Sequence, residues 1–125
     1  MKAAVIHSFG APDVLTVEDV LKPEPGPDDV LIKVLAIGLN RIDHYVREGW
    51  INPDIQFPHV LGSDISGEIE SVGENVKEFK KGDRVVPLPG YPVESDEMPS
   101  SPLAATPSYA IRGVKHWGAY AEYMV

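Results

Sequence analysis

The fold of this chain is decided by residues 30–49, which read VLIKVLAIGLNRIDHYVREG. Val30 to Ile37 form the most apolar run of the chain, and their length and β-branching predict a buried strand. Gly38 ends this run. Residues 40–48 carry apolar side chains at helical spacing, and Gly49 stands where helices commonly end, so a very short helix is predicted. A strand that leads directly into a short helix is therefore the centre of the predicted structure.

Short strands are predicted on both sides of this centre. Two strand-like runs, Lys2–His7 and Val14–Val20, are separated by Gly, Pro and Asp, which is typical of a hairpin. Residues 23–29 include three prolines, so this segment is predicted to be an exposed connection. Further strands are expected at Ile65–Val72, with a close backbone approach at Gly67, at Val85-Val86 and at 119–125. This pattern of many short strands indicates a mainly β domain.

Composition narrows the possible functions. The chain has 125 residues, 11 Lys and Arg, 19 Asp and Glu and no cysteine, so its formal net charge is −8. This length suits one domain with one core. The lack of cysteine excludes disulfides, thiolate zinc sites and iron–sulfur clusters within this chain, and the negative charge opposes nucleic acid and anionic membranes. No segment has the pattern of a signal peptide or of a membrane span, so a cytoplasmic location is expected.

The segment from Pro87 to about Lys115 differs from the rest because it contains six prolines and shows no periodicity. A loop of this length in a small domain is typical of a functional or mobile segment. Strand-like composition returns at 119–125, and the chain stops inside that run. We therefore expect the chain to be a piece of a larger protein.

Four motifs occur in a recognisable order: GLNRIDHYVREG at 38–49, FPHVLGSDISG at 57–67, Val72-Gly73, and KGDRV at 81–85. Together they resemble the N-terminal GroES-like catalytic domain of the medium-chain dehydrogenases and reductases, especially the quinone oxidoreductase-like and zinc-type alcohol dehydrogenase-like branches. Each motif alone is weak evidence for a family, whereas four motifs in this order are strong evidence. The resemblance covers residues 1–125 and implies a mainly β fold, a GroES-like irregular β-barrel with one or two short helices.

The chain departs from the zinc enzymes of that family. Zinc members place a Cys where Asn40 stands, and a His followed by a Glu where Ser63 and Asp64 stand. Amide and hydroxyl groups are not the ligands that zinc takes in proteins, so no catalytic zinc is expected. A rearranged metal site that uses His44, His59 or Asp64 stays open as an alternative.

The family also has an optional lobe in which four cysteines bind a structural zinc. Residues 90–115 keep the length of this lobe but contain no cysteine. The resemblance therefore implies a degenerate lobe that has lost its metal. Without the binding energy that folds such sites, we expect this loop to be the least ordered part of the domain.

Relatives that lack zinc reduce enones or quinones by hydride transfer from NADPH, so the resemblance implies three catalytic residues, Asn40, Ser63 and Asp64. The amide of Asn40 can donate to a substrate carbonyl oxygen as negative charge develops there, and the alternative is that Asn40 caps the helix. Ser63 and Asp64 line the cleft in this interpretation. The alternative for this pair is a turn in which the Asp64 carboxylate accepts local backbone N–H groups.

The expected cofactor contacts are Asn40, Arg41 and Tyr45. The resemblance places Tyr45 near the nicotinamide and Arg41 at a phosphate, whereas the alternatives are an amphipathic core Tyr and a solvated surface Arg. Asp43 matches a residue that orients a ligand His in the zinc members. Because this chain lacks that His, Asp43 is predicted to pair with Arg47 or to cap backbone groups.

No Gly-x-Gly-x-x-Gly turn occurs in the 125 residues, so the nucleotide-binding Rossmann domain is expected outside this chain, and NADP is expected to bind mainly there. The chain alone is expected to be inactive and to form the substrate side of an NAD(P)H-dependent oxidoreductase. Its substrate would be a small-molecule carbonyl, enone or quinone, and the parent protein would be a homo-oligomer. Two alternatives stay open: a zinc alcohol dehydrogenase with altered ligands, and a non-enzymatic GroES-like binding or assembly module.

Overall fold

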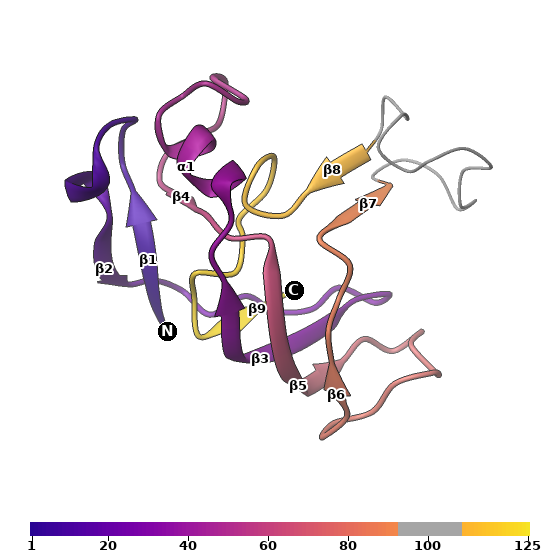
Figure 1. The fold of residues 1–125 in the computed structure, drawn as a ribbon. Coiled ribbons are helices and arrows are strands. Elements are labelled where there is room, and N and C mark those ends of the chain that lie inside the picture. Colours follow the sequence, from indigo (N-terminus) through magenta and orange to yellow (C-terminus); the bar gives the residue numbers. More distant parts are fainter. Residues whose placement is uncertain (93–108) are drawn as a thin grey trace.

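The computed structural model describes residues 1–92 and 109–125 (Figure 1). Their strands form three sheets, with strand orders β2-β1-β4, β6-β5-β3-β9 and β7-β8. The elements in chain order are β1 (Lys2–Ile6), η1 (Pro12–Val14), β2 (Thr16–Asp19), β3 (Val30–Gly38), α1 (Arg41–Arg47), β4 (His59–Val60), β5 (Asp64–Val72), β6 (Arg84–Val85), β7 (Gly90–Pro92), β8 (Tyr109–Ile111) and β9 (Tyr123–Met124). A mainly β fold with short helices, as the sequence predicts, is confirmed.

The first sheet contains the predicted hairpin. β1 and β2 pair antiparallel, from Lys2 opposite Asp19 to Val5 opposite Thr16. β2 begins later than predicted, because Pro12 opens the 3-10 turn η1, where its missing N–H needs no partner. β4 pairs with the other edge of β1.

The second sheet is built on the antiparallel pair β3 and β5, whose register runs from Val30 opposite Val72 to Gly38 opposite Asp64. The predicted close approach at Gly67 is confirmed, because a Cβ there would lie 2.4 Å from Ile32 Cγ2 and 2.5 Å from the Lys33 carbonyl oxygen. This register brings the residues after β3 next to the first residues of β5. It thereby places the two central motifs of the sequence side by side.

The prediction that the 30–37 strand is buried is wrong for its second half. Leu31 and Ile32 are buried, but Leu35 is 53% exposed and Ile37 is 44% exposed. β9 pairs with β3 only at Ile32 and Lys33, and register shifts interrupt the pairing with β5. The far end of β3 therefore lacks a neighbouring strand on one side, and its apolar side chains reach the surface.

The segment 119–124 joins the first two sheets. Ala121 forms a bridge with Ala3, and the Tyr120 carbonyl accepts a hydrogen bond of 2.7 Å from the Ala4 N–H. The Glu122 carbonyl accepts a bond of 2.9 Å from Val34 in the other sheet. The core consists of three buried clusters: Ile6, Val46, Ile55 and Leu61; Ile32, Ile65, Ala119 and Met124; and Ala3, Val5 and Val60.

The 87–115 segment, predicted to be an irregular loop, contains regular structure at both ends. β7 and β8 pair antiparallel, with Gly90 opposite Ile111. The central part of the predicted zinc-free lobe, residues 93–108, lies outside the described residues. Within the two described ranges no helix has the length and apolar character needed to cross a membrane.

Candidate functional site

The three predicted catalytic residues meet where β3 ends and β5 begins. Asn40 occupies the position before α1, in extended backbone with φ −112° and ψ 153°. Because Gly38 pairs with Asp64 across the sheet, Asn40 lies beside the start of β5. The Asn40 Nδ2 atom donates to Ser63 Oγ at 3.2 Å and to Asp64 Oδ2 at 2.7 Å. We call these three residues the amide cluster.

The chemistry of the amide cluster fixes the direction of its hydrogen bonds. An ionised carboxylate only accepts, so the nitrogen of the Asn40 amide must face Asp64. Both N–H bonds of this amide are then directed at protein acceptors. The Ser63 hydroxyl accepts from the amide and keeps its own proton for a further acceptor. Ser63 is 4% exposed, so its hydroxyl is itself largely shielded from water.

Asp43 anchors the amide cluster from inside the domain. It is 5% exposed, and its Oδ2 atom accepts from the Asn40 N–H and from the Tyr120 hydroxyl, both at 2.8 Å. Of the two predicted roles for Asp43, capping is confirmed and pairing with Arg47 is not found. Burial, together with the hydrogen bond and charge of Asp43, raises the pKa of Tyr120, so its hydroxyl stays protonated as a donor.

Arg47 is used to hold the loop before η1 onto α1. The guanidinium donates to the Gly10 carbonyl and to His44 Nδ1, and it forms an ion pair of 2.9 Å with Glu48. The Gly10 N–H in turn donates to the Arg47 carbonyl at 3.0 Å. This buried cation therefore has several partners, none of which is Asp43.

The predicted cofactor contacts lie away from the buried face of α1. Asp43, Val46 and Arg47 face the interior, whereas Arg41 is exposed and Tyr45 is half-buried. Arg41 and Tyr45 are four residues apart and so share one face of the helix. Both positions are accessible to a ligand.

The residues of the amide cluster do not fit a zinc ion. They offer an amide, a hydroxyl and one carboxylate, whereas zinc in proteins is held by thiolate, imidazole and carboxylate groups. His59 is buried and its Nε2 donates to the Gly113 carbonyl at 3.0 Å, and burial lowers its pKa. His44 Nδ1 accepts from Arg47. Among the described residues no group of three or more His, Cys, Asp or Glu side chains could hold a metal ion.

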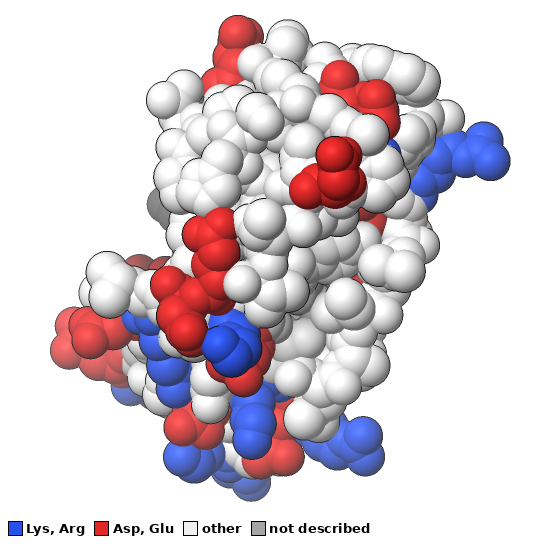
Figure 2. All heavy atoms as spheres, turned by 90° about the vertical axis from the view of Figure 1, so that its left-hand side faces the viewer, with Lys and Arg blue, Asp and Glu red and all other residues white. Residues whose placement is uncertain are grey.

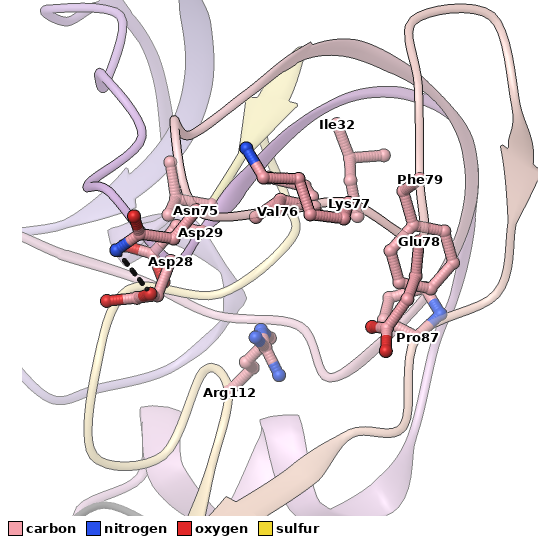
Figure 3. A pocket seen from close by; sticks show the side chains of 12 residues that line it. Asp28, Asp29, Ile32, Asn75, Val76, Lys77, Glu78, Phe79, Pro87 and Arg112 are labelled. Atoms are coloured by element: carbon pink, nitrogen blue, oxygen red, sulfur yellow. Dashed lines mark hydrogen bonds between the residues drawn. The ribbon is translucent and has the colours of Figure 1, made fainter.

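A cavity of about 500 Å³ opens elsewhere, between the 28–29 turn, the 75–79 segment and Arg112 (Figure 3). The Arg112 guanidinium faces this cavity from below, and the Asp28–Asn75 hydrogen bond of 2.9 Å closes one side. Its charged lining residues are three acidic ones, Asp28, Asp29 and Glu78, and two basic ones, Lys77 and Arg112, so neither sign of charge dominates. It shares no lining residue with the amide cluster.

Two contributors to the site were not foreseen from the sequence. Tyr120 lies 77 residues from Asp43 in the chain, and nothing in its local pattern indicates their hydrogen bond. Trp50 stacks on Tyr45, with 5.5 Å between ring centroids and 26° between planes. Its place directly after the helix-ending Gly49 is the signal that could have drawn attention to it.

Comparison with known proteins gives the family. A family model described as alcohol dehydrogenase GroES-like domain matches residues 26–125. Quinone oxidoreductase of Rattus norvegicus is 46% identical over 86 residues, which make up 68% of this chain and 26% of that protein. Sorbitol dehydrogenase of Macaca fascicularis is 44% identical over 96 residues, 75% of this chain and 26% of that protein. The chain thus spans about a quarter of the length of these curated relatives.

Solved structures agree with this assignment. The structure of an NAD-dependent alcohol dehydrogenase matches 99% of this chain with a TM-score of 0.90 and 41% sequence identity, and the match covers 36% of that protein's chain. Escherichia coli quinone oxidoreductase complexed with NADPH matches 69% of this chain with a TM-score of 0.65 and 35% sequence identity, and the match covers 26% of that protein's chain. These likenesses confirm the predicted GroES-like fold. The chain belongs to the alcohol dehydrogenase GroES-like domain family of the medium-chain dehydrogenases and reductases.

Proposed function

We propose that this domain forms the substrate side of the cleft in a longer NAD(P)H-dependent oxidoreductase, which reduces a quinone or enone without zinc. The observation that carries the proposal is the amide cluster, in which Asn40, Ser63 and Asp64 are joined by hydrogen bonds. These side chains can bind and polarise a carbonyl oxygen through hydrogen bonds alone. The proposal includes a small-molecule substrate, a cytoplasmic location and a homo-oligomeric parent protein.

Each member of the amide cluster has a distinct task in this proposal. Asp64 accepts from the Asn40 amide and fixes its orientation. Asn40 then donates to Ser63 Oγ, which leaves the Ser63 proton directed away from the amide. Ser63 donates that hydrogen bond to the substrate carbonyl oxygen, where negative charge develops as hydride arrives at carbon. Asp43 and Tyr120 keep Asn40 in place from the buried side.

The residues present fit one part of a nicotinamide cofactor. Arg41 and Tyr45 share an accessible face of α1, beside Asn40, and would contact NADPH there. When bound, the cofactor supplies the hydride. The chain has no glycine-rich turn for the pyrophosphate, so most of the binding energy would come from a domain outside residues 1–125. Support for NADPH comes from the Escherichia coli relative, whose structure contains it.

A second candidate function is that of an alcohol dehydrogenase that has kept a metal through altered ligands. What favours it is the match with an NAD-dependent alcohol dehydrogenase over 99% of this chain, against 69% for the Escherichia coli quinone oxidoreductase. The amide and hydroxyl groups of the amide cluster are not the ligands that zinc takes in proteins, which argues against this second candidate. Measuring the zinc content of the parent enzyme separates the two candidates.

Replacing Ser63 with alanine tests the proposed role of its hydroxyl. In the parent enzyme, we expect Ser63→Ala to lower kcat for quinone reduction by NADPH about ten-fold to a hundred-fold, because a hydrogen bond to developing charge is worth ~1.5–3 kcal/mol. The measurement is steady-state NADPH oxidation with a soluble quinone. Ser66→Ala, on the same strand, is the control and should leave kcat unchanged. Equal kcat values for Ser63→Ala and wild type would contradict the proposal.

A further inference from the structure

Three rings at the end of α1, those of His44, Tyr45 and Trp50, form one aromatic surface, which we call the aromatic platform. Trp50 lies nearly parallel to Tyr45, at 5.5 Å between centroids and 26° between planes. His44 meets Trp50 edge-on, at 5.5 Å and 70°, and is tilted against Tyr45 at 5.6 Å. The stacked and edge-on geometries are those that aromatic pairs favour.

The backbone holds the aromatic platform in place. The Trp50 N–H donates to the Tyr45 carbonyl at 2.9 Å, and the Gly49 N–H donates to Val46 at the same distance. The Glu48 N–H donates to His44 at 3.0 Å. The backbone that carries the rings is therefore held in place before any ligand arrives, which reduces the entropy lost on binding.

Trp50 differs from two other exposed aromatic residues, Phe57 and Trp117. Its side chain is 68% exposed although one face rests on Tyr45. Phe57 by contrast packs edge-on against Phe9, and the indole N–H of Trp117 donates to the Pro58 carbonyl. An exposed ring that is stacked on one side only can accept a second ring on the other, and such stacking is worth ~1–3 kcal/mol.

His44 adds a hydrogen-bond donor to the aromatic platform. Arginine cannot accept a hydrogen bond, so its 2.8 Å contact makes His44 Nδ1 the acceptor from Arg47. In the neutral ring the proton then resides on Nε2, for which no partner is found in the part of the chain that the structure describes. The aromatic platform thus combines a flat apolar face with a donor, which suits a planar ring that carries carbonyl oxygens.

α1 links the aromatic platform to the amide cluster along the chain, since Asn40 precedes the helix and Trp50 follows it. In Figure 2 the charged side chains gather towards the lower end, whereas the upper end, where Figure 1 shows α1, carries fewer of them, most of them acidic and separated by uncharged surface. Such surroundings suit an uncharged conjugated ring. We propose that the free face of Trp50 in the aromatic platform binds the ring of the acceptor substrate, a quinone, and that Trp50 determines specificity for ring-shaped acceptors, while Tyr45 keeps its proposed contact with the cofactor. This inference rests on the proposed function.

The test measures binding to the 125-residue chain and requires no turnover. The probe is 2,3-dimethoxy-5-methyl-1,4-benzoquinone, an uncharged soluble quinone. In a Trp117→Phe background, Trp50 is the only tryptophan, and we expect saturable quenching of its fluorescence. Ligand-observed NMR should show that the wild type binds the quinone. We expect Trp50→Leu to weaken the affinity for the quinone at least about five-fold, because one stacked ring is lost. Trp50→Phe, which keeps a ring, should restore most of the affinity.

Competitors identify the ring that occupies the aromatic platform. We expect cyclohexane-1,4-dione, which has the same carbonyl spacing without conjugation, to bind more weakly than the quinone. Displacement of the quinone by nicotinamide mononucleotide would instead assign the surface to the cofactor and overturn the proposal. Unsaturable quenching, or equal affinity of wild type and Trp50→Leu with unchanged thermal midpoints, would also overturn it. Failure of the Ser63→Ala prediction would leave these binding results untouched, so the two proposals fail separately.

Discussion

Replacing Gly62 with alanine is expected to lower the free energy of unfolding by ~3 kcal/mol or more, because positive φ costs about 1–2 kcal/mol and overpacking adds about 1–3. Gly62 has φ +99°, and a Cβ there would lie 2.4 Å from Tyr120 Cδ1 and 3.1 Å from the Tyr120 nitrogen. The ring cannot move aside freely, because its hydroxyl is bonded to Asp43. The loss should appear in urea unfolding of the 125-residue chain.

Gly82 supplies the matched control for this substitution. Its φ of +92° is nearly the same, but a Cβ there would meet nothing within 4 Å. Gly82→Ala should therefore show only the cost of the backbone conformation, about 1–2 kcal/mol. The difference between the two variants measures the packing of Tyr120 on the turn that precedes Ser63. Equal losses would show that this packing does not hold the turn.

Replacing Asn40 with aspartate should make stability depend on pH. The substitution puts a second carboxylate where an amide nitrogen lies 2.7 Å from Asp64 Oδ2. Two carboxylates that share a site cannot both ionise easily, so we expect the pair to bind a proton at a pH well above the ordinary pKa of Asp. At neutral pH we expect a loss of about 2–3 kcal/mol, since the site is half-buried and solvent partly screens the repulsion.

The direction of the pH effect follows from proton linkage. In the Asn40→Asp variant the folded state binds more protons than the unfolded state between the ordinary Asp pKa and the raised value. Stability relative to wild type should therefore recover as the pH falls from 7 towards 5. Asn40→Ala removes the same hydrogen bonds without adding charge, so its deficit should stay constant over this range. Parallel pH profiles for the two variants would show that position 40 and Asp64 are not close neighbours.

The three residues of the amide cluster were singled out through the family resemblance of two ordered motifs, whereas the hydrogen bonds that join them were not predicted. They meet because β3 pairs with β5, with Gly38 opposite Asp64. The helix was predicted from the spacing of its apolar residues and from its final Gly49, which are local signals. Local patterns thus suffice to predict single elements of the fold.

Features that depend on distant segments were not predictable in this way. The exposure of Leu35 and Ile37 depends on where β9 stops pairing with β3, which the apolar run itself does not encode. The bond from Tyr120 to Asp43 depends on how residues 119–124 cross between the sheets. The pairing of β7 with β8 is another long-range contact, formed by short segments that lack any periodicity.

Whether reduction beside Asn40 needs zinc is decided by measuring zinc content and quinone turnover in one preparation of the parent enzyme, before and after a strong chelator. We expect no stoichiometric zinc and equal turnover in both samples, because the amide, hydroxyl and single carboxylate found here are a poor ligand set for zinc. One zinc per chain, lost together with activity on chelation and missing from an Asn40→Ala variant, would contradict the proposed mechanism.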